Sequence, residues 1–198
     1  EHWVMEKKVD DFVFIKVGTG IGSGLILGGR LHRGATGAAG DIGHVRTTTD
    51  DVLCRCGNNG CLEATAGGAA IAAHLRERGY EAAGSRDVVR LVEKGNREAT
   101  RSVRSAGRLI GQVLASTVNL LNPAMIMIGG DMAKAEPQLL AGIREVVYQR
   151  STTLSTTDLQ IVSSSLGDHA GVTGAAAMVI EHILTPSAID HALAGGST

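Results

Sequence analysis

Short apolar runs separated by glycines fill the beginning of the chain. The run FVFIKV at residues 12–17 is rich in β-branched and aromatic residues, which predicts a strand, and residues 25–27 and 30–33 continue the pattern. Glycine-rich turns at 18–24 and 28–29 separate these runs. Strands joined by such turns predict an antiparallel meander at the start of the fold.

Beyond residue 68 the apolar positions take the spacing of helices. Asn96 is placed to cap a long helix that ends at Asn122 and Pro123, and Gly107 and Gly111 allow this helix to pack closely against a neighbour. The other predicted elements are strands over 45–47, 124–128 and 159–162, helices over 69–78, 85–93 (capped by Ser85), 137–149 and from residue 174, and a flexible tail over 186–198.

Antiparallel strands followed by alternating helices and strands predict an α/β fold. Ligands gather where the strands of such sheets end. The glycine-rich strand ends at 18–24, 129–130 and 171–174 are therefore expected to converge on one cleft.

Composition narrows the classes of function. The net charge is −1 and aromatic residues make up 3% of the chain, so this segment offers neither a basic surface nor a stacking platform for nucleic acid. No apolar run reaches the length of a membrane span, and clustered cysteines without a secretion signal predict the cytoplasm. The chain begins at Glu1 without an initiator methionine, close to the first predicted strand, which suggests a piece of a longer polypeptide.

The most informative stretch runs from residue 37 to residue 63. It holds all three cysteines of the chain within eight residues of one another, ten residues after a histidine. One imidazole and three thiolates make a complete tetrahedral set for a structural zinc ion. Three unrelated buried thiols are the alternative, but the glycine- and asparagine-rich surroundings argue against it, and a disulfide would leave one thiol over. The predicted zinc ligands are His44, Cys54, Cys56 and Cys61.

Two carboxylates flank these residues. If residues 61–63 are extended, Cys61 and Glu63 share a face, and Asp41 lies three residues before His44. Ionised carboxylates accept hydrogen bonds from hydroxyls, so acids and an imidazole held on a glycine-rich turn suit a polyhydroxylated ligand. The spacing leaves equally open that Asp41 and Glu63 only support the metal ligands.

The glycines at 18–24 satisfy G-x-G-x-x-G only superficially, because a dinucleotide fingerprint opens a helix and this one leads into a strand. A glycine-rich hairpin can still bring backbone N–H groups to a phosphate. A tight hairpin that needs positive φ angles explains the glycines by itself and is the preferred interpretation.

Three motifs together resemble the ROK family (repressors, open reading frames, sugar kinases): GTGIGSG at 18–24, GAAGDIGH at 37–44 and CRCGNNGCLE at 54–63. The similarity extends to NP at 122–123, GG at 129–130 and GVTGAA at 171–176.

The resemblance implies the C-terminal lobe of an actin-like ATPase (hexokinase-type) fold over residues 1–185, with a zinc loop over 44–61. It also implies that sugar hydroxyls are bound by Asp41, His44 and Glu63, with one ring nitrogen of His44 on the metal and the other on the sugar. In kinase members, ATP and Mg²⁺ would be held near the glycine hairpin. The nucleotide positions implied for a kinase are Gly18, Thr19, Gly20, Gly22, Gly24, Gly129 and Gly130.

Two departures from the family pattern bear on function. Kinase members carry a catalytic Asp, after an Asn, on a segment that would precede Glu1, so no catalytic residue is assigned in this chain. The family's glutamate before Ile-Gly-His is Asp41 here, whose carboxylate reaches about 1.5 Å less far. The second departure favours the regulator branch of the family, where phosphoryl transfer is not required.

The leading hypothesis is the sugar-binding effector lobe of a ROK transcriptional regulator that is cytoplasmic and forms a homodimer or higher homo-oligomer. DNA would be bound only through an upstream helix-turn-helix outside this chain, and no membrane contact is expected. An ATP-dependent, glucokinase-like sugar kinase is the alternative, and a zinc-stabilised oligomerisation module is a weaker one.

Overall fold

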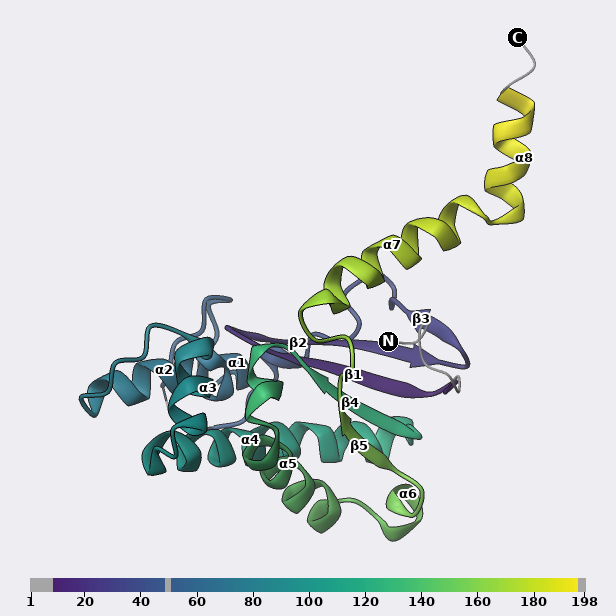
Figure 1. Cartoon of the computed structure of the whole chain (residues 1–198). Coiled ribbons are helices and arrows are strands. Elements are labelled where there is room, and N and C mark those ends of the chain that lie inside the picture. Colours follow the sequence, from purple (N-terminus) through teal and green to yellow (C-terminus); the bar gives the residue numbers. More distant parts are fainter. Residues whose placement is uncertain (1–8, 49–50, 196–198) are drawn as a thin grey trace.

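The structure is a computed structural model that describes residues 9–48 and 51–195. Its described residues form a five-stranded mixed sheet in the order β3-β2-β1-β4-β5 (Figure 1). The first three strands are antiparallel, and β4 and β5 continue the sheet in parallel with β1. The predicted meander is confirmed. The strands are β1 (Phe12–Val17), β2 (Ile21–Leu27), β3 (Arg30–His32), β4 (Met125–Gly129) and β5 (Gln160–Ser163).

Helices lie between β3 and β4, between β4 and β5, and after β5. The strand predicted over 45–47 is wrong, since only an isolated bridge between Arg46 and Cys61 forms there. The α-helices are α1 (Leu62–Ala66), α2 (Gly68–Glu77), α3 (Ser85–Glu93), α4 (Arg97–Leu121), α5 (Glu136–Arg150), α6 (Thr153–Thr156), α7 (Ala170–Ile183) and α8 (Pro186–Gly195). Shorter 3-10 turns are η1 (Ile42–His44), η2 (Asp131–Ala135) and η3 (Gly167–His169).

One face of the sheet is closed by α4 and α5. Alternate residues of β1 enter this core, among them the fully buried Ile15. The predicted close approach of α4 to a neighbour is confirmed, because a Cβ on Gly107 would lie 2.5 Å from the carbonyl oxygen of Leu139 in α5. The predicted cap is confirmed as well, since the backbone N–H of Ala99 donates to the Asn96 side chain at 2.9 Å.

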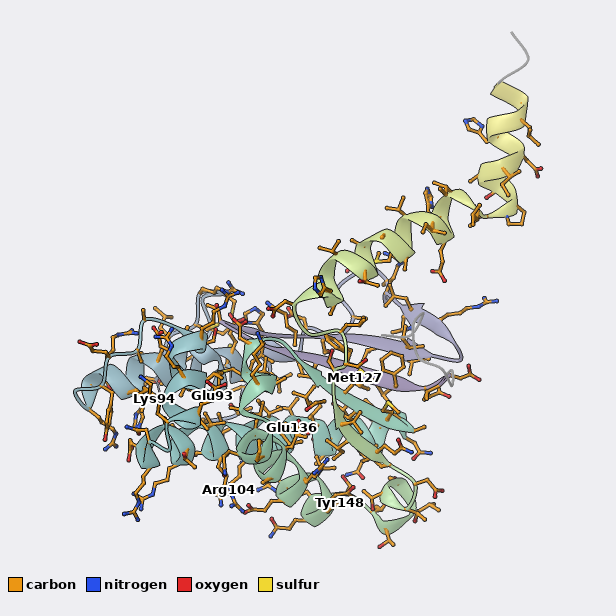
Figure 2. The ribbon with its side chains drawn as sticks, viewed as in Figure 1. Glu93, Lys94, Arg104, Met127, Glu136 and Tyr148 are labelled. Carbon is orange, nitrogen blue, oxygen red and sulfur yellow. The ribbon has the colours of Figure 1, made fainter. Side chains whose placement is uncertain are left out.

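The opposite face of the sheet is less covered. Helix α7 begins at Ala170, four residues earlier than the expected start at Gly174, and runs outward with α8 as an arm (Figure 1). None of its residues is buried, and its side chains point outward on all sides (Figure 2). The region predicted as a tail is helical over Pro186–Gly195, and its last three residues lie outside the described part of the chain. Over residues 9–48 and 51–195, no helix combines the length and the apolar character needed to cross a bilayer.

Candidate metal and ligand site

Four side chains converge where η1, the following loop and the start of α1 meet. His44 ends η1, Cys54 and Cys56 lie in the loop, and Cys61 immediately precedes α1. All four potential ligand atoms lie within 4.8 Å of one another. His44 Nδ1 lies 3.5 Å from Cys54 Sγ, and the Sγ atoms of Cys56 and Cys61 are 3.6 Å apart.

These separations fit a tetrahedral ion. Zinc–sulfur bonds of about 2.3 Å in tetrahedral geometry place two sulfurs about 3.8 Å apart. The donor set of one imidazole and three thiols is also the chemistry that zinc prefers in closed sites. The predicted cluster is therefore brought together, and it could hold a metal ion such as zinc.

Backbone hydrogen bonds shape the loop that carries the thiols. The N–H of Cys54 donates to the carbonyl of Asn58 at 2.8 Å, and the N–H of Gly57 returns to the carbonyl of Cys54 at 2.9 Å. Gly60 has a φ of 72°, and a Cβ there would collide with the carbonyl oxygen of Thr48. This turn brings Cys56 and Cys61 onto one side.

The thiols have different proton affinities in this arrangement. The pKa of Cys56 is lowered to about 7, chiefly by a hydrogen bond from the backbone of Asn58. The pKa of Cys61 is raised to about 12, chiefly by burial and then by its thiol neighbours. A divalent cation reverses the second effect, because its charge favours every nearby thiolate.

The two ring nitrogens of His44 lie toward different groups. Nδ1 faces the thiol cluster, while Nε2 lies 3.9 Å from a carboxylate oxygen of Asp41. Asp41 is 62% exposed and precedes η1, so its carboxylate is open to solvent beside the imidazole. This geometry leaves one ring nitrogen on the ligand side when the other faces a metal.

Glu63 reaches the site by a route that the sequence did not predict. Residues 61–63 are not extended, because α1 begins at Leu62 and carries Glu63 in its first turn. The carboxylate bends back to the glycine hairpin, where the N–H of Ile21 donates to Oε2 at 3.0 Å. Gly20 lies so close to Glu63 Oε2 that a Cβ would overlap it.

Arg55 is a site residue that sequence reasoning missed. Its Nε lies 2.7 Å from Glu63 Oε1, and its Nη2 donates to Glu63 Oε2 at 3.1 Å. The side chain of Arg55 is 77% exposed, while that of Glu63 is only 10% exposed. The only sign of this role in the sequence is that Arg55 stands between two predicted metal ligands, Cys54 and Cys56.

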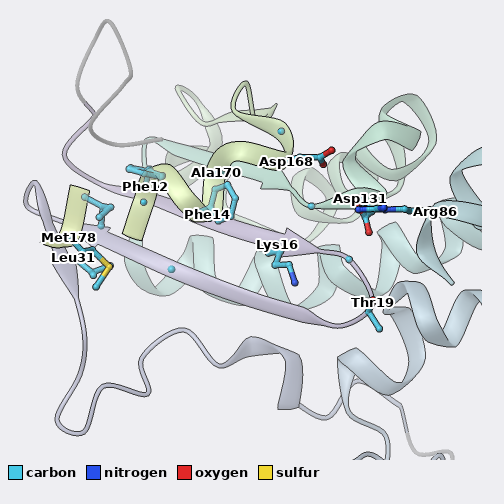
Figure 3. Close-up of a pocket in the computed structure, with 17 residues that line it drawn as sticks. Phe12, Phe14, Lys16, Thr19, Leu31, Arg86, Asp131, Asp168, Ala170 and Met178 are labelled. Atoms are coloured by element: carbon cyan, nitrogen blue, oxygen red, sulfur yellow. The ribbon is translucent and has the colours of Figure 1, made fainter. Parts of the chain in front are cut away.

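A second feature is a cavity of about 560 Å³ on the less covered face of the sheet (Figure 3). Gly18, Gly130 and Gly171 all line it, so the expected convergence is confirmed. Gly171, however, lies in the first turn of α7 and not at the end of a strand. Met178 of α7 and Leu31 of β3 lie at one end of the cavity, and Arg86 and Asp131 lie at the other (Figure 3).

The seven positions implied for nucleotide binding do not all reach this cavity. Gly18, Thr19, Gly24 and Gly130 line it, whereas Gly20 packs against Glu63. Gly22 and Gly129 are not among the lining residues.

The polar end of the cavity is built from paired charges. The hydroxyl of Ser85 donates to Asp131 at 2.9 Å, and Arg86 lies 3.5 Å from the same carboxylate. The expectation that Ser85 caps α3 is wrong, because Gly84 occupies the cap position and the buried hydroxyl serves Asp131 instead. Lys134 pairs with Asp168 at 3.2 Å on the α7 side.

The model of the ROK family matches residues 1–182. The xylose repressor of Caldicellulosiruptor bescii is 34% identical over 93% of this chain and 50% of its own length. The N-acetylglucosamine repressor of Escherichia coli O157:H7 is 32% identical over 98% of this chain and 50% of its own length. The chain thus spans about half the length of the curated relatives it matches.

Solved structures of the same family share the fold. A ROK family glucokinase from Streptomyces griseus, in complex with glucose and AMPPNP, superposes with a TM-score of 0.76 at 28% identity, covering 88% of this chain and 62% of that one. A ROK family transcriptional regulator, a homolog of the E. coli MLC protein, gives a TM-score of 0.73 at 30% identity, covering 78% of this chain and 42% of that one. The predicted hexokinase-type α/β fold is confirmed, and the chain belongs to the ROK family.

Proposed function

We propose that this chain is the effector-binding lobe of a sugar-responsive ROK transcriptional regulator. The observation that carries the proposal is the similarity to repressors at 34% and 32% identity across 93% and 98% of the chain. The site needs only to bind a sugar in this role, and no base to activate a hydroxyl is required.

The sugar would be held by Asp41, His44 and Glu63. Two carboxylates accept hydrogen bonds from hydroxyls, and the imidazole supplies a third directional partner through Nε2. Support comes from the proximity of Nε2 to Asp41 at 3.9 Å and from the hydrogen bond that fixes Glu63 on the hairpin at 3.0 Å.

Zinc would act as a structural ion on His44, Cys54, Cys56 and Cys61. A closed set of four protein ligands leaves no position for water or substrate, so the ion would contribute rigidity to the ligand site. Its role would be to fix His44 and the loop that carries Arg55.

In the whole protein, sugar binding would be read out through DNA. We propose a cytoplasmic homodimer or higher homo-oligomer whose DNA-binding helix-turn-helix lies outside this chain. Sugar would stabilise one closure state and thereby change the spacing of the DNA-binding heads, because a ligand shifts an equilibrium only by its differential affinity.

An ATP-dependent sugar kinase is the second candidate. It is favoured by the similarity to the S. griseus glucokinase and by the cavity of about 560 Å³ beside the glycine hairpin. In that case Gly18, Thr19, Gly24 and Gly130 would approach the phosphates of ATP with Mg²⁺, and the base would come from outside this chain.

A panel of monosaccharides scored by thermal shift on the zinc-loaded, full-length protein tests the proposal. A ligand that binds only the folded protein raises its Tm, with about 2.7 kcal/mol of stabilisation at a hundred times Kd. We expect one sugar to raise the Tm and to change operator binding, without release of ADP when ATP is added. Sugar-dependent release of ADP would replace the regulator with the kinase, and no shift with any sugar would refute both.

A further inference from the structure

The carboxylate of Glu63 already has partners on most sides. Ile21 donates to Oε2, and Arg55 contacts both oxygens through Nε and Nη2. A carboxylate offers about four acceptor positions, so these contacts take three of them. A sugar hydroxyl that is to be bound by Glu63 must share this crowded group.

The partners of Glu63 differ in how readily they can leave. The N–H of Ile21 belongs to the first residue of β2, and Gly20 packs directly against the carboxylate. The side chain of Arg55, in contrast, is 77% exposed, whereas that of Glu63 is 10% exposed. The exposed guanidinium can return to water at small cost because arginine remains charged and hydrated there, and a sugar hydroxyl can take its place as donor to the carboxylate.

The loop over residues 44–61 that carries the four candidate metal ligands (the metal loop) determines where Arg55 can reach. Arg55 lies between Cys54 and Cys56, and the hydrogen bonds of Cys54 with Asn58 and Gly57 fix the backbone on either side. The side chain can move, but its origin stays beside the ligand site. Arg55 therefore stays at a high local concentration near Glu63.

We propose that Arg55 lowers the affinity of the site for an uncharged sugar, because its guanidinium competes with the sugar hydroxyls for Glu63. The inference rests on the proposed function of Glu63 as a sugar-binding group. An uncharged sugar binds only as Arg55 leaves Glu63. The free energy of the Arg55–Glu63 pair therefore reduces the free energy of sugar binding.

Salt dependence distinguishes competition from a structural role. An uncharged sugar has no charge of its own to screen. Raising the ionic strength from about 0.01 M to about 1 M shortens the Debye length from about 30 Å to about 3 Å, and this weakens the hold of Glu63 on the exposed guanidinium of Arg55. The affinity of the native protein for the sugar is therefore expected to rise with salt.

Isothermal titration of zinc-loaded, full-length protein with D-glucose, D-xylose and N-acetyl-D-glucosamine tests the proposal. We expect R55A to bind the preferred sugar about fivefold more tightly than the native protein at low salt, with little salt dependence. R55K should fall between the two, because lysine offers a point charge in place of the two-pronged contact. Zinc content is measured for each variant, so that loss of metal is recognised.

R78A is the matched control. Arg78, which directly follows α2, is also exposed, and its Nε pairs with the carboxylate of Glu98 in α4 at 3.2 Å. R78A changes the net charge by the same amount as R55A. We expect R78A to bind the sugar with the affinity and the salt dependence of the native protein. A second measurement follows the Arg55 Nε–H signal by NMR, assigned by its loss in R55A, and this signal should move when sugar saturates the site.

The outcomes separate the inference from the proposed function. The competition is overturned if the native and R55A proteins bind sugar with equal affinity and equal salt dependence, or if R55A binds more weakly. In either case the proposed sugar binding still stands. An Arg55 signal that does not move on saturation also overturns the competition. Absence of binding by both proteins refutes sugar binding itself, and the role of Arg55 with it.

Discussion

The metal loop and the cavity below α7 both adjoin the glycine hairpin, yet they are built in opposite ways. At the metal loop, side chains from separate segments point at one centre, with ligand atoms within 4.8 Å of one another. At the cavity, glycines open a space of about 560 Å³, and the charged groups at its rim pair with each other, as Asp131 does with Arg86 and Asp168 with Lys134.

The difference teaches which region depends on a bound group. The three clustered thiols could hold a cation, whose charge would favour every thiolate, whereas in its absence the pKa of Cys56 is lowered and that of Cys61 is raised. At the rim of the cavity the charged side chains pair with each other. The hairpin links the two regions, because Ile21 donates to Glu63 on one side while Gly18 lines the cavity on the other.

Removing a buried metal ligand should have the largest effect on this comparison. Cys61 is 1% exposed, and C61S replaces its sulfur with a hydroxyl that binds zinc poorly. We expect bound zinc to fall from about one ion per chain to nearly none, with faster hydrogen exchange over residues 40–66 and unchanged exchange in α4 and α5. Retention of a full equivalent of zinc by C61S would contradict the assigned ligand set.

Lowering the pH should release zinc reversibly from the metal loop and leave the cavity unchanged. Protons compete with zinc for thiolates, so zinc affinity falls as the pH falls. The folded-state pKa of Cys56 lies below its ordinary value of 9.0, so its ionised form stabilises the fold above pH 9 and this contribution is lost as the pH falls through about 7. Zinc release to a colorimetric chelator, followed from about pH 8 to about pH 5, should rise steeply. A flat profile would mean that the thiols do not hold the ion.

A methyl group on the hairpin should affect ligand binding more than stability. The Cβ in G20A would overlap the end of the Glu63 side chain, which must rotate away from Ile21. We expect sugar affinity to fall about tenfold, roughly the loss of one hydrogen bond to a charged group. The matched control is G22A, because a Cβ on Gly22 meets nothing within 4 Å. Equal sugar affinity in both variants would show that the position of Glu63 is unimportant for binding.

The smallest expected effect is at the rim of the cavity. S85A removes the buried hydroxyl that donates to Asp131 at 2.9 Å, and we expect a loss of about 1 kcal/mol in the free energy of unfolding. S105A, at an exposed position of α4, is the control and should be close to neutral. Urea unfolding measures the stability of both variants. A change in zinc content or sugar affinity in S85A would show that the two regions are coupled.

The sequence predicted the elements whose signals are local. The long helix α4 was placed by the Asn96 cap and by its end at Asn122 and Pro123, and the cap is confirmed by the bond to Ala99. Ser85 shows the limit of such signals, because a serine before an apolar run resembles a cap whether its hydroxyl serves the helix or a distant carboxylate.

Residues 61–63 show a second limit. Three residues are compatible with a strand or with the start of a helix, and the alternation argument chose the strand. Leu62, fully buried in the main core with the apolar residues of α4, begins α1. Tertiary packing decided the conformation, so Glu63 reaches the site from a helix turned toward the hairpin.

The sequence by itself predicted which four side chains meet in the metal loop, because a histidine and three cysteines close along the chain can converge through local turns. Only the tertiary structure decided the surroundings of Glu63, since its contact with Ile21 spans 42 positions and its pairing with Arg55 depends on the turn of the loop. Contacts between distant segments arise from the packing of whole elements, and residue type and spacing alone do not encode them.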